Sequence, residues 1–87
     1  MPYTVYILRT SQNTLYTGQT NNLENRLREH SDKKGNGSKY LRAFPSFTLV
    51  YKEVYSSRKE AMQREWQLKK WTKAKKEKLI SGDLKKL

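Results

Sequence analysis

The chain contains no cysteine and has only 87 residues. A chain of this size buries little more than ~60% of its unfolded surface, so without disulfides its helices and strands must share one hydrophobic core. We therefore expect a single domain over residues 1–87. The missing cysteines exclude thiolate zinc sites and cysteine nucleophiles. The single histidine, His30, excludes a metal site built from several histidines.

Three runs rich in β-branched and aromatic residues predict strands, at residues 3–9, 15–20 and 47–55. Turn-forming residues separate the first two runs, which predicts a hairpin. Three capping signals predict helices that end near residues 31, 71 and 82. The signals are Asn21-Asn22, the capping box from Ser57 to Glu60, and Thr72. The expected order is ββαβαα, an α+β fold with a three-stranded, mostly antiparallel sheet flanked by helices.

The formal charge of +11 predicts a polyanionic partner, and nucleic acid fits better than a membrane. No apolar run is long enough to cross a bilayer, and the N-terminus does not have the pattern of a signal peptide, so we expect a cytoplasmic protein. No small-molecule substrate is expected. The density of lysine is highest after residue 57, which indicates either a solvated helix face or a phosphate-contacting face. The candidate nucleic-acid contacts are Lys39, Arg42, Lys69, Lys70, Lys73 and Lys76.

Glu65 interrupts the apolar side of the second predicted helix. On a helical wheel it lies roughly 40° from Ala61, inside an arc that also contains Met62, Trp66, Leu68 and Trp71. Arg64 and Lys69 fall in the same arc, but their long side chains can reach water. A shorter carboxylate there needs a partner, because an unpaired buried charge is costly. The sequence leaves open an ion pair with a nearby arginine or a metal ion.

Arg26 and His30 lie four residues apart on one face of the first predicted helix. They lie roughly 60° from the apolar stripe, at the border between core and solvent. An arginine at such a border can bind phosphate in a bidentate way, and a histidine can exchange protons near neutral pH. The alternative is an ordinary surface arginine and a capping histidine.

The predicted hairpin brings Tyr6 near Tyr16 and Gly18. Directly opposed residues of a hairpin share a face, and so do residues two apart in one strand. Tyr6 and Tyr16 therefore share a face only if the residue numbers of each opposed pair add up to an even number. A connection of three or five residues gives an even sum, and one of two or four residues does not. The three-residue connection pairs Tyr6 with Gly18. A glycine within a strand indicates a close approach, either of a phosphodiester or of a packing helix.

The order Thr4-Val5-Tyr6, Tyr16-Thr17-Gly18, Arg26, His30 and Glu65 resembles the GIY-YIG nuclease domain. The chain is most similar to the small stand-alone bacterial branch of that superfamily, whose members are mostly uncharacterised, over residues 3–79. The resemblance implies the same three-stranded fold and an endonuclease that hydrolyses phosphodiester bonds in DNA, with RNA as the alternative. It also implies one divalent metal ion, Mg²⁺ or else Mn²⁺.

The resemblance implies a role for each matching residue. Glu65 corresponds to the metal ligand, and Arg26 to the arginine that stabilises the phosphate. Tyr6 corresponds to a tyrosine that acts as general base or orients the attacking water, and Tyr16 to the second tyrosine of the site. Gly18 corresponds to the glycine beside the scissile phosphate, and His30 to a histidine that carries a proton or contacts phosphate.

One departure from the family pattern bears on activity. Many relatives have an asparagine after the glutamate, whereas no asparagine follows Asn36 here, and the stretch from Thr72 to Lys76 is cationic. The departure implies weakened catalysis. It leaves two alternatives to an endonuclease of low sequence specificity: a non-catalytic nucleic-acid-binding module with the nuclease fold, and a basic RNA-associated protein.

Overall fold

The structure is a computed structural model that describes residues 2–31 and 46–82. Two of the predicted nucleic-acid contacts, Lys39 and Arg42, lie outside the described residues. None of the described helices is long and apolar enough to cross a membrane.

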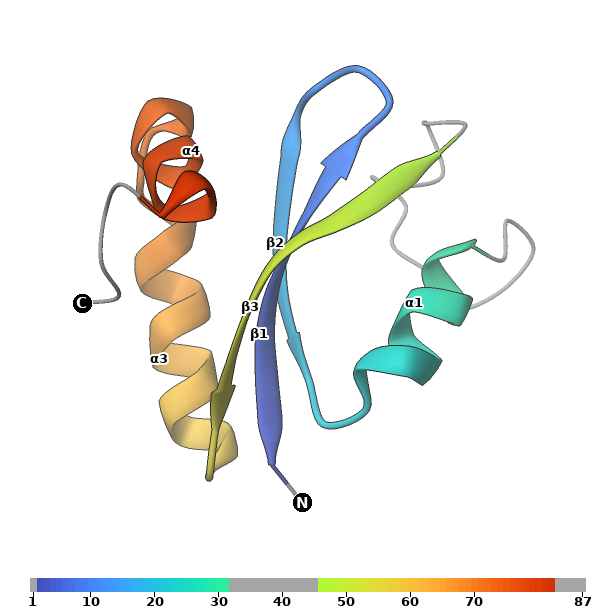
Figure 1. Ribbon diagram of the computed structural model, residues 1–87. Helices are drawn as coiled ribbons and strands as arrows, with labels where there is room; N and C mark the ends of the chain where they lie inside the picture. The colour runs from blue at the N-terminus through green and yellow to red at the C-terminus, as the bar shows by residue number, and fades with distance from the viewer. Residues whose placement is uncertain (1, 32–45, 83–87) are drawn as a thin grey trace.

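Three antiparallel strands form the sheet, in the spatial order β2-β1-β3. They are β1 (Tyr3–Thr10), β2 (Leu15–Thr20) and β3 (Phe47–Tyr55). Figure 1 shows β1 in the centre, with the hairpin partner β2 on one side and β3 on the other. The predicted strands, the hairpin and the antiparallel sheet are confirmed.

The last backbone pair of the hairpin is Thr10 with Thr14, so a three-residue connection, residues 11–13, fixes its register. The backbone N–H of Thr10 donates to the carbonyl of Thr14 at 2.9 Å, and Asn13 between them has φ of 65°. Asparagine tolerates this left-handed conformation, which the third position of such a loop requires. The register pairs Tyr6 with Gly18. The even-sum pairing predicted for the three-residue connection is therefore confirmed.

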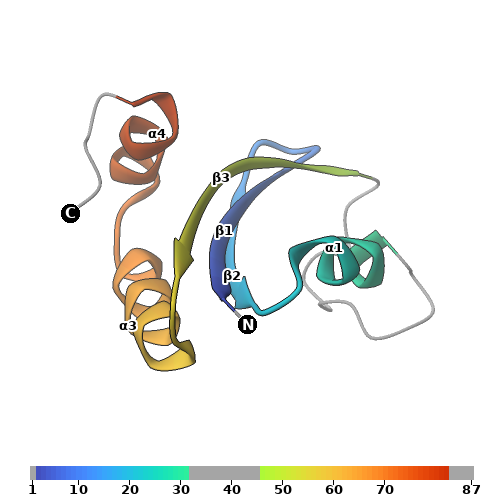
Figure 2. The same cartoon turned by 60° about the horizontal axis from the view of Figure 1, so that its bottom comes forward.

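Three described helices cover the two faces of the sheet, α1 (Leu23–Ser31), α3 (Arg58–Lys69) and α4 (Lys73–Ser81). Figure 2 shows α1 on one face, with α3 and α4 on the other. The caps agree with the sequence. Ser57 accepts a hydrogen bond from the Glu60 N–H, Thr72 accepts one from the Lys75 N–H, and Gly82 ends α4 with φ of 88°. The predicted order ββαβαα is confirmed.

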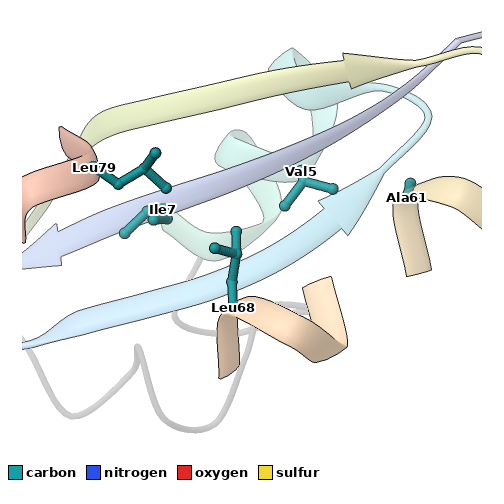
Figure 3. Close-up of a cluster of buried hydrophobic side chains, with 5 residues drawn as sticks. All are labelled: Val5, Ile7, Ala61, Leu68 and Leu79. Carbon is teal, nitrogen blue, oxygen red and sulfur yellow. The ribbon is translucent and has the colours of Figure 1, made fainter. Parts of the chain in front are cut away.

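Because β1 is central, its alternating side chains are buried on both faces of the sheet. Val5 and Ile7 pack against Ala61, Leu68 and Leu79 of α3 and α4 (Figure 3). Tyr6 and Leu8 project to the opposite face, where they pack against α1 and the neighbouring strands. The expected single core is thus divided by the sheet into two apolar clusters, and Tyr6 belongs to the cluster beneath α1.

The prediction that Met62 and Trp66 lie on the buried side of α3 is wrong. Ala61 and Leu68 are buried as expected, but Met62 is 45% exposed and Trp66 is 64% exposed. Arg64, expected to reach water, is only 4% exposed. The helix is therefore rotated about its axis so that the side carrying Arg64, and not the side carrying Trp66, faces the sheet.

A buried carboxylate on β3 explains this rotation. Glu53 accepts hydrogen bonds from Arg64 Nε at 2.9 Å and from Arg64 Nη2 at 3.1 Å. The hydroxyls of Tyr51 and Tyr55 donate to the same carboxylate. Burial raises the pKa of Glu53, but these hydrogen bonds outweigh it and hold the pKa below its usual value. Trp71 packs beneath the guanidinium, with its ring centroid 5.2 Å from Arg64 Cζ.

Candidate active site at the edge of the sheet

The ring of Tyr6 lies across the edge strand β2, and Gly18 makes room for it. A Cβ atom at Gly18 would stand 2.5 Å from the Tyr6 hydroxyl oxygen and 2.7 Å from Cζ. Any larger residue would displace the ring, so the glycine is required by Tyr6 itself. Sequence reasoning expected a phosphodiester or a helix at this position. The structure places a side chain of the site there instead.

Tyr16 and Arg26 join Tyr6 on the same face of the sheet. The ring centroids of Tyr6 and Tyr16 are 6.5 Å apart, and the ring planes are inclined by 37°. Arg26 reaches the pair from α1 and hydrogen-bonds to the Tyr6 side chain. Its guanidinium also pairs with Glu29 at 3.2 Å. Three of the predicted site residues therefore meet beside β2.

Burial, and to a lesser extent the neighbouring Tyr16, raise the pKa of Tyr6 to about 12. The hydrogen bond and positive charge of Arg26 lower the pKa, but by less. Tyr6 is consequently protonated at neutral pH. In the free protein its hydroxyl can donate or accept a hydrogen bond, but it does not act as a strong base.

Glu65 approaches the edge strand from the other face of the sheet. Arg64, one residue earlier on α3, points to β3, so the flank of the helix that carries Glu65 turns toward β2. The negative charge of Glu65 also raises the pKa of Tyr6, although by less than burial or Tyr16 does. We call the set of Tyr6, Tyr16, Gly18, Arg26 and Glu65 the β2-edge site.

The ion pair of Glu65 differs from the one considered from the sequence. Its carboxylate lies 3.2 Å from the ammonium of Lys69, one turn further along α3, and it forms no ion pair with an arginine of the described residues. The Glu65 side chain is 21% exposed, so it keeps access to solvent. The arginine-carboxylate pair in this region is Arg64 with Glu53, which sequence reasoning did not identify.

Two polar side-chain atoms of β2 on this flank are not used by the described fold. Thr17 and Gln19 oppose Ile7 and Val5, so they face α3. The buried atoms Thr17 Oγ1 and Gln19 Oε1 have no hydrogen-bond partner within the described part of the chain. Oxygen atoms of this kind and one accessible carboxylate suit a hydrated Mg²⁺, which keeps several of its own waters.

The described residues offer few other metal-binding side chains. Within residues 2–31 and 46–82, no three His, Cys, Asp or Glu side chains are grouped so that they could hold a metal ion. Glu65 is therefore the one predicted ligand of the β2-edge site. It lines a groove of about 340 Å³ together with Met62, Gln63, Trp66 and Lys69.

His30 belongs to α1, four residues after Arg26, as predicted. Its side chain lies outside what the structure describes, so its role stays a prediction.

The predicted lysine contacts have different surroundings. Lys69 pairs with Glu65, and Lys73 pairs with Glu77 at 3.0 Å. The ammonium of Lys70 lies 3.4 Å from the centroid of the Trp66 ring. Burial lowers the pKa of Lys76, and the charge of Lys69 lowers it further. Lys76 and Lys69 are therefore close enough for their charges to repel each other, and Lys69 is also the partner of Glu65.

Comparisons with known proteins identify the family of the chain. The family profile described as the GIY-YIG catalytic domain matches residues 2–78. A UPF0213 protein of Natronomonas pharaonis is 43% identical over 79 residues, which cover 91% of each chain. A UPF0213 protein of Clostridium perfringens is 46% identical over 78 residues, 90% of this chain and 82% of the relative.

A solved structure shows the same fold. The solution NMR structure of a UPF0213 protein from Bacillus halodurans matches with a TM-score of 0.60 and 37% sequence identity. The match covers 93% of this chain and 84% of the other. The resemblance inferred from the two tripeptides, Arg26, His30 and Glu65 is thereby confirmed at the level of family and fold.

Proposed function

The chain belongs to the GIY-YIG catalytic-domain family, and from this we propose that it is a metal-dependent DNA endonuclease with low intrinsic sequence specificity. The proposal is carried by the convergence of Tyr6, Tyr16 and Arg26 at a strand edge that also lies within electrostatic reach of Glu65. The net charge of +11 favours a polyanionic substrate.

Arg26 is the residue that stabilises the phosphate in this proposal. A guanidinium binds two phosphate oxygens at once and stays charged at every relevant pH. The neighbouring groups, Glu29 and Tyr6, hold the pKa of Arg26 above its usual value despite burial. As negative charge spreads over the phosphate oxygens in the transition state, this fixed charge lowers the barrier.

Tyr6 orients the attacking water in this proposal, and it does not remove its proton in the free protein. With a pKa of about 12, only about one molecule in 10⁵ carries a phenolate at pH 7. The hydroxyl is held by packing over Gly18 and by Arg26, so it presents a lone pair in a fixed direction. The ring of Tyr16 lies beside that of Tyr6, with 6.5 Å between the two centroids.

Glu65 would hold the divalent ion, Mg²⁺ or Mn²⁺, on the flank of α3 that faces β2. The bound ion supplies positive charge to the phosphate and to the leaving oxygen. Lys69 must release Glu65 before the carboxylate is fully available, which it can do because it is 55% exposed.

The second candidate function is a nucleic-acid-binding module without catalysis. The observation that favours it is the pairing of Glu65 with Lys69, together with lysine in place of asparagine at the start of α4. In that case the cationic stretch binds phosphate, and the carboxylate only orders the lysine.

Cleavage of end-labelled DNA tests the proposal. Wild-type protein is incubated with single-stranded, duplex and branched DNA in Mg²⁺, Mn²⁺ or EDTA. We expect cleavage with metal and none in EDTA. Arg26→Ala should lower the rate about 100-fold, whereas Arg28→Ala, on the exposed side of α1, should retain it. Binding without cleavage in every metal would favour the second candidate.

A further inference from the structure

Trp66 and Met62 form an exposed apolar surface that the fold does not use. Trp66 is 64% exposed and Met62 is 45% exposed. Neither belongs to the two apolar clusters of the described core. An exposed tryptophan beside a second large apolar side chain is typical of a binding surface.

Two lysines, Lys69 and Lys70, flank this surface. The Lys70 ammonium lies 3.4 Å from the Trp66 ring centroid, and Lys69 lines the groove of about 340 Å³ that Trp66 and Met62 share with Glu65. Lys70 does not line the groove, so the groove opens on a side of the indole that Lys70 leaves uncovered. An aromatic ring between lysines is the arrangement that accepts a nucleobase and its phosphates.

We propose that Trp66 is a stacking platform for an unpaired nucleobase, and that the β2-edge site therefore acts on DNA with a single-stranded segment. This inference rests on the proposed nuclease function. A base in a duplex is stacked on both faces and cannot reach the indole, whereas an unpaired base can. Because Glu65 and Trp66 line one groove, a base on Trp66 brings its own backbone to the carboxylate.

A second copy of this chain is the competing occupant, and the charges disfavour it. Each copy would bring Lys69 and Lys70 to the contact, in a chain that carries a net charge of +11. Like charges that face each other oppose association. The same charges attract a polyanion, so the surface is complementary to nucleic acid and not to itself.

Binding in EDTA tests the platform independently of cleavage. The probes are a fluorescein-labelled thymidine oligonucleotide, a duplex of the same length and a uridine oligoribonucleotide. Trp66→Leu should weaken binding of the thymidine oligonucleotide about tenfold and leave duplex binding unchanged, because stacking on the aromatic ring is lost while apolar bulk is kept. Trp66→Phe should restore most of the affinity. Val54→Ala, a loss of exposed apolar surface on β3, should have no effect.

Each other outcome overturns the inference in whole or in part. Equal weakening of single-stranded and duplex binding, or no change in either, would show that Trp66 is not a base platform. A dimer in light scattering that Trp66→Leu dissociates would assign the surface to a second copy. Tighter binding of the uridine oligonucleotide would assign it to RNA. Loss of single-strand binding in Trp66→Leu without any cleavage by the wild type would support the platform and contradict the nuclease.

Discussion

Arg64 and Glu65 are neighbours on α3, yet one charged group is buried and the other is open to solvent. Arg64 is 4% exposed and donates two hydrogen bonds to Glu53, at 2.9 and 3.1 Å. Glu65 lines an open groove and pairs with an exposed lysine at 3.2 Å. A charged residue on an apolar helix face is therefore structural or functional according to how completely its partners satisfy it.

The two carboxylates differ in the same respect. Glu53 accepts from the guanidinium and from two tyrosine hydroxyls, which together engage both of its oxygens. A carboxylate so fully engaged has little capacity left for a metal ion. Glu65 pairs with an exposed lysine and is itself 21% exposed, so a cation or a water molecule can approach it.

The largest effect should follow from breaking the buried pair. Arg64→Met keeps the length of the side chain but leaves Glu53 without its cation, and it should lower the free energy of unfolding by about 3–5 kcal/mol. Urea denaturation followed by circular dichroism measures the change. The double variant Arg64→Met with Glu53→Leu should recover much of the loss, since no charge then stays buried. A loss below about 1 kcal/mol for the single variant would contradict this interpretation.

Glu65→Gln should have little effect on stability and a large effect on cleavage. The change is nearly isosteric and removes one negative charge, so unfolding should shift by less than about 0.5 kcal/mol, while cleavage should fall at least 100-fold. Metal-free DNA binding should stay equal or become tighter, because a charge that repels phosphate is lost.

Glu60→Gln is the matched control for this change, because it lies on the same helix and glutamine also supports a capping box. It should alter neither cleavage nor stability noticeably. A Glu65→Gln variant that unfolds easily and loses DNA binding together with cleavage would assign Glu65 to the structural class of Glu53.

Alkaline pH should destabilise both regions. The pKa of Tyr6 is raised by burial from 10.0 to about 12, so between these pH values the unfolded chain binds fewer protons than the folded one. The free energy of unfolding must then fall as pH rises from 10 to 12, by on the order of 2–3 kcal/mol for Tyr6. The contribution is complete below pH 10 and lost above 12.

Comparison of two variants isolates each tyrosine from the lysines that titrate nearby. Urea denaturation at pH 9, 10, 11 and 12 should show a shallower fall in Tyr6→Phe than in the wild type. Tyr55→Phe should also reduce the fall, because burial and the hydrogen bond to Glu53 together raise the pKa of Tyr55 to about 12. Identical pH profiles for the wild type and Tyr6→Phe would contradict the buried, protonated state of Tyr6.

Local signals predicted most of the fold. The caps at Ser57, Thr72 and Gly82 act within a few residues of their helices, so each is visible in the sequence. The hairpin register follows from one parity rule once the three-residue connection is chosen, and that rule alone predicts the pairing of Tyr6 with Gly18. The site residues Tyr16 and Arg26 then reach the same face because β2 leads directly into α1.

Tertiary contacts decided what the sequence left open. Two overlapping arcs of α3 contain apolar residues, one toward Trp71 and one toward Trp66, and helical periodicity does not choose between them. The choice is made by Glu53 on β3, which is 11 residues away from Arg64. Tyr51, Glu53 and Tyr55 alternate along β3, which indicates a polar cluster on one face of the strand. The sequence alone does not show that the cation of this cluster is Arg64, because a long arginine side chain can also reach water.

The smallest effect should come from removing the cation that restrains Glu65. Exposed pairs one helical turn apart contribute about 0.3–0.5 kcal/mol, so Lys69→Met should barely change stability. The same energy corresponds to about twofold tighter Mn²⁺ binding, because the ion no longer competes with Lys69. Water-proton relaxation measures this affinity without any cleavage. Lys73→Met is the control, since it breaks an equivalent pair with Glu77 on α4 and should leave Mn²⁺ affinity unchanged. Equal effects of the two variants would mean that Mn²⁺ responds to net charge and not to Glu65.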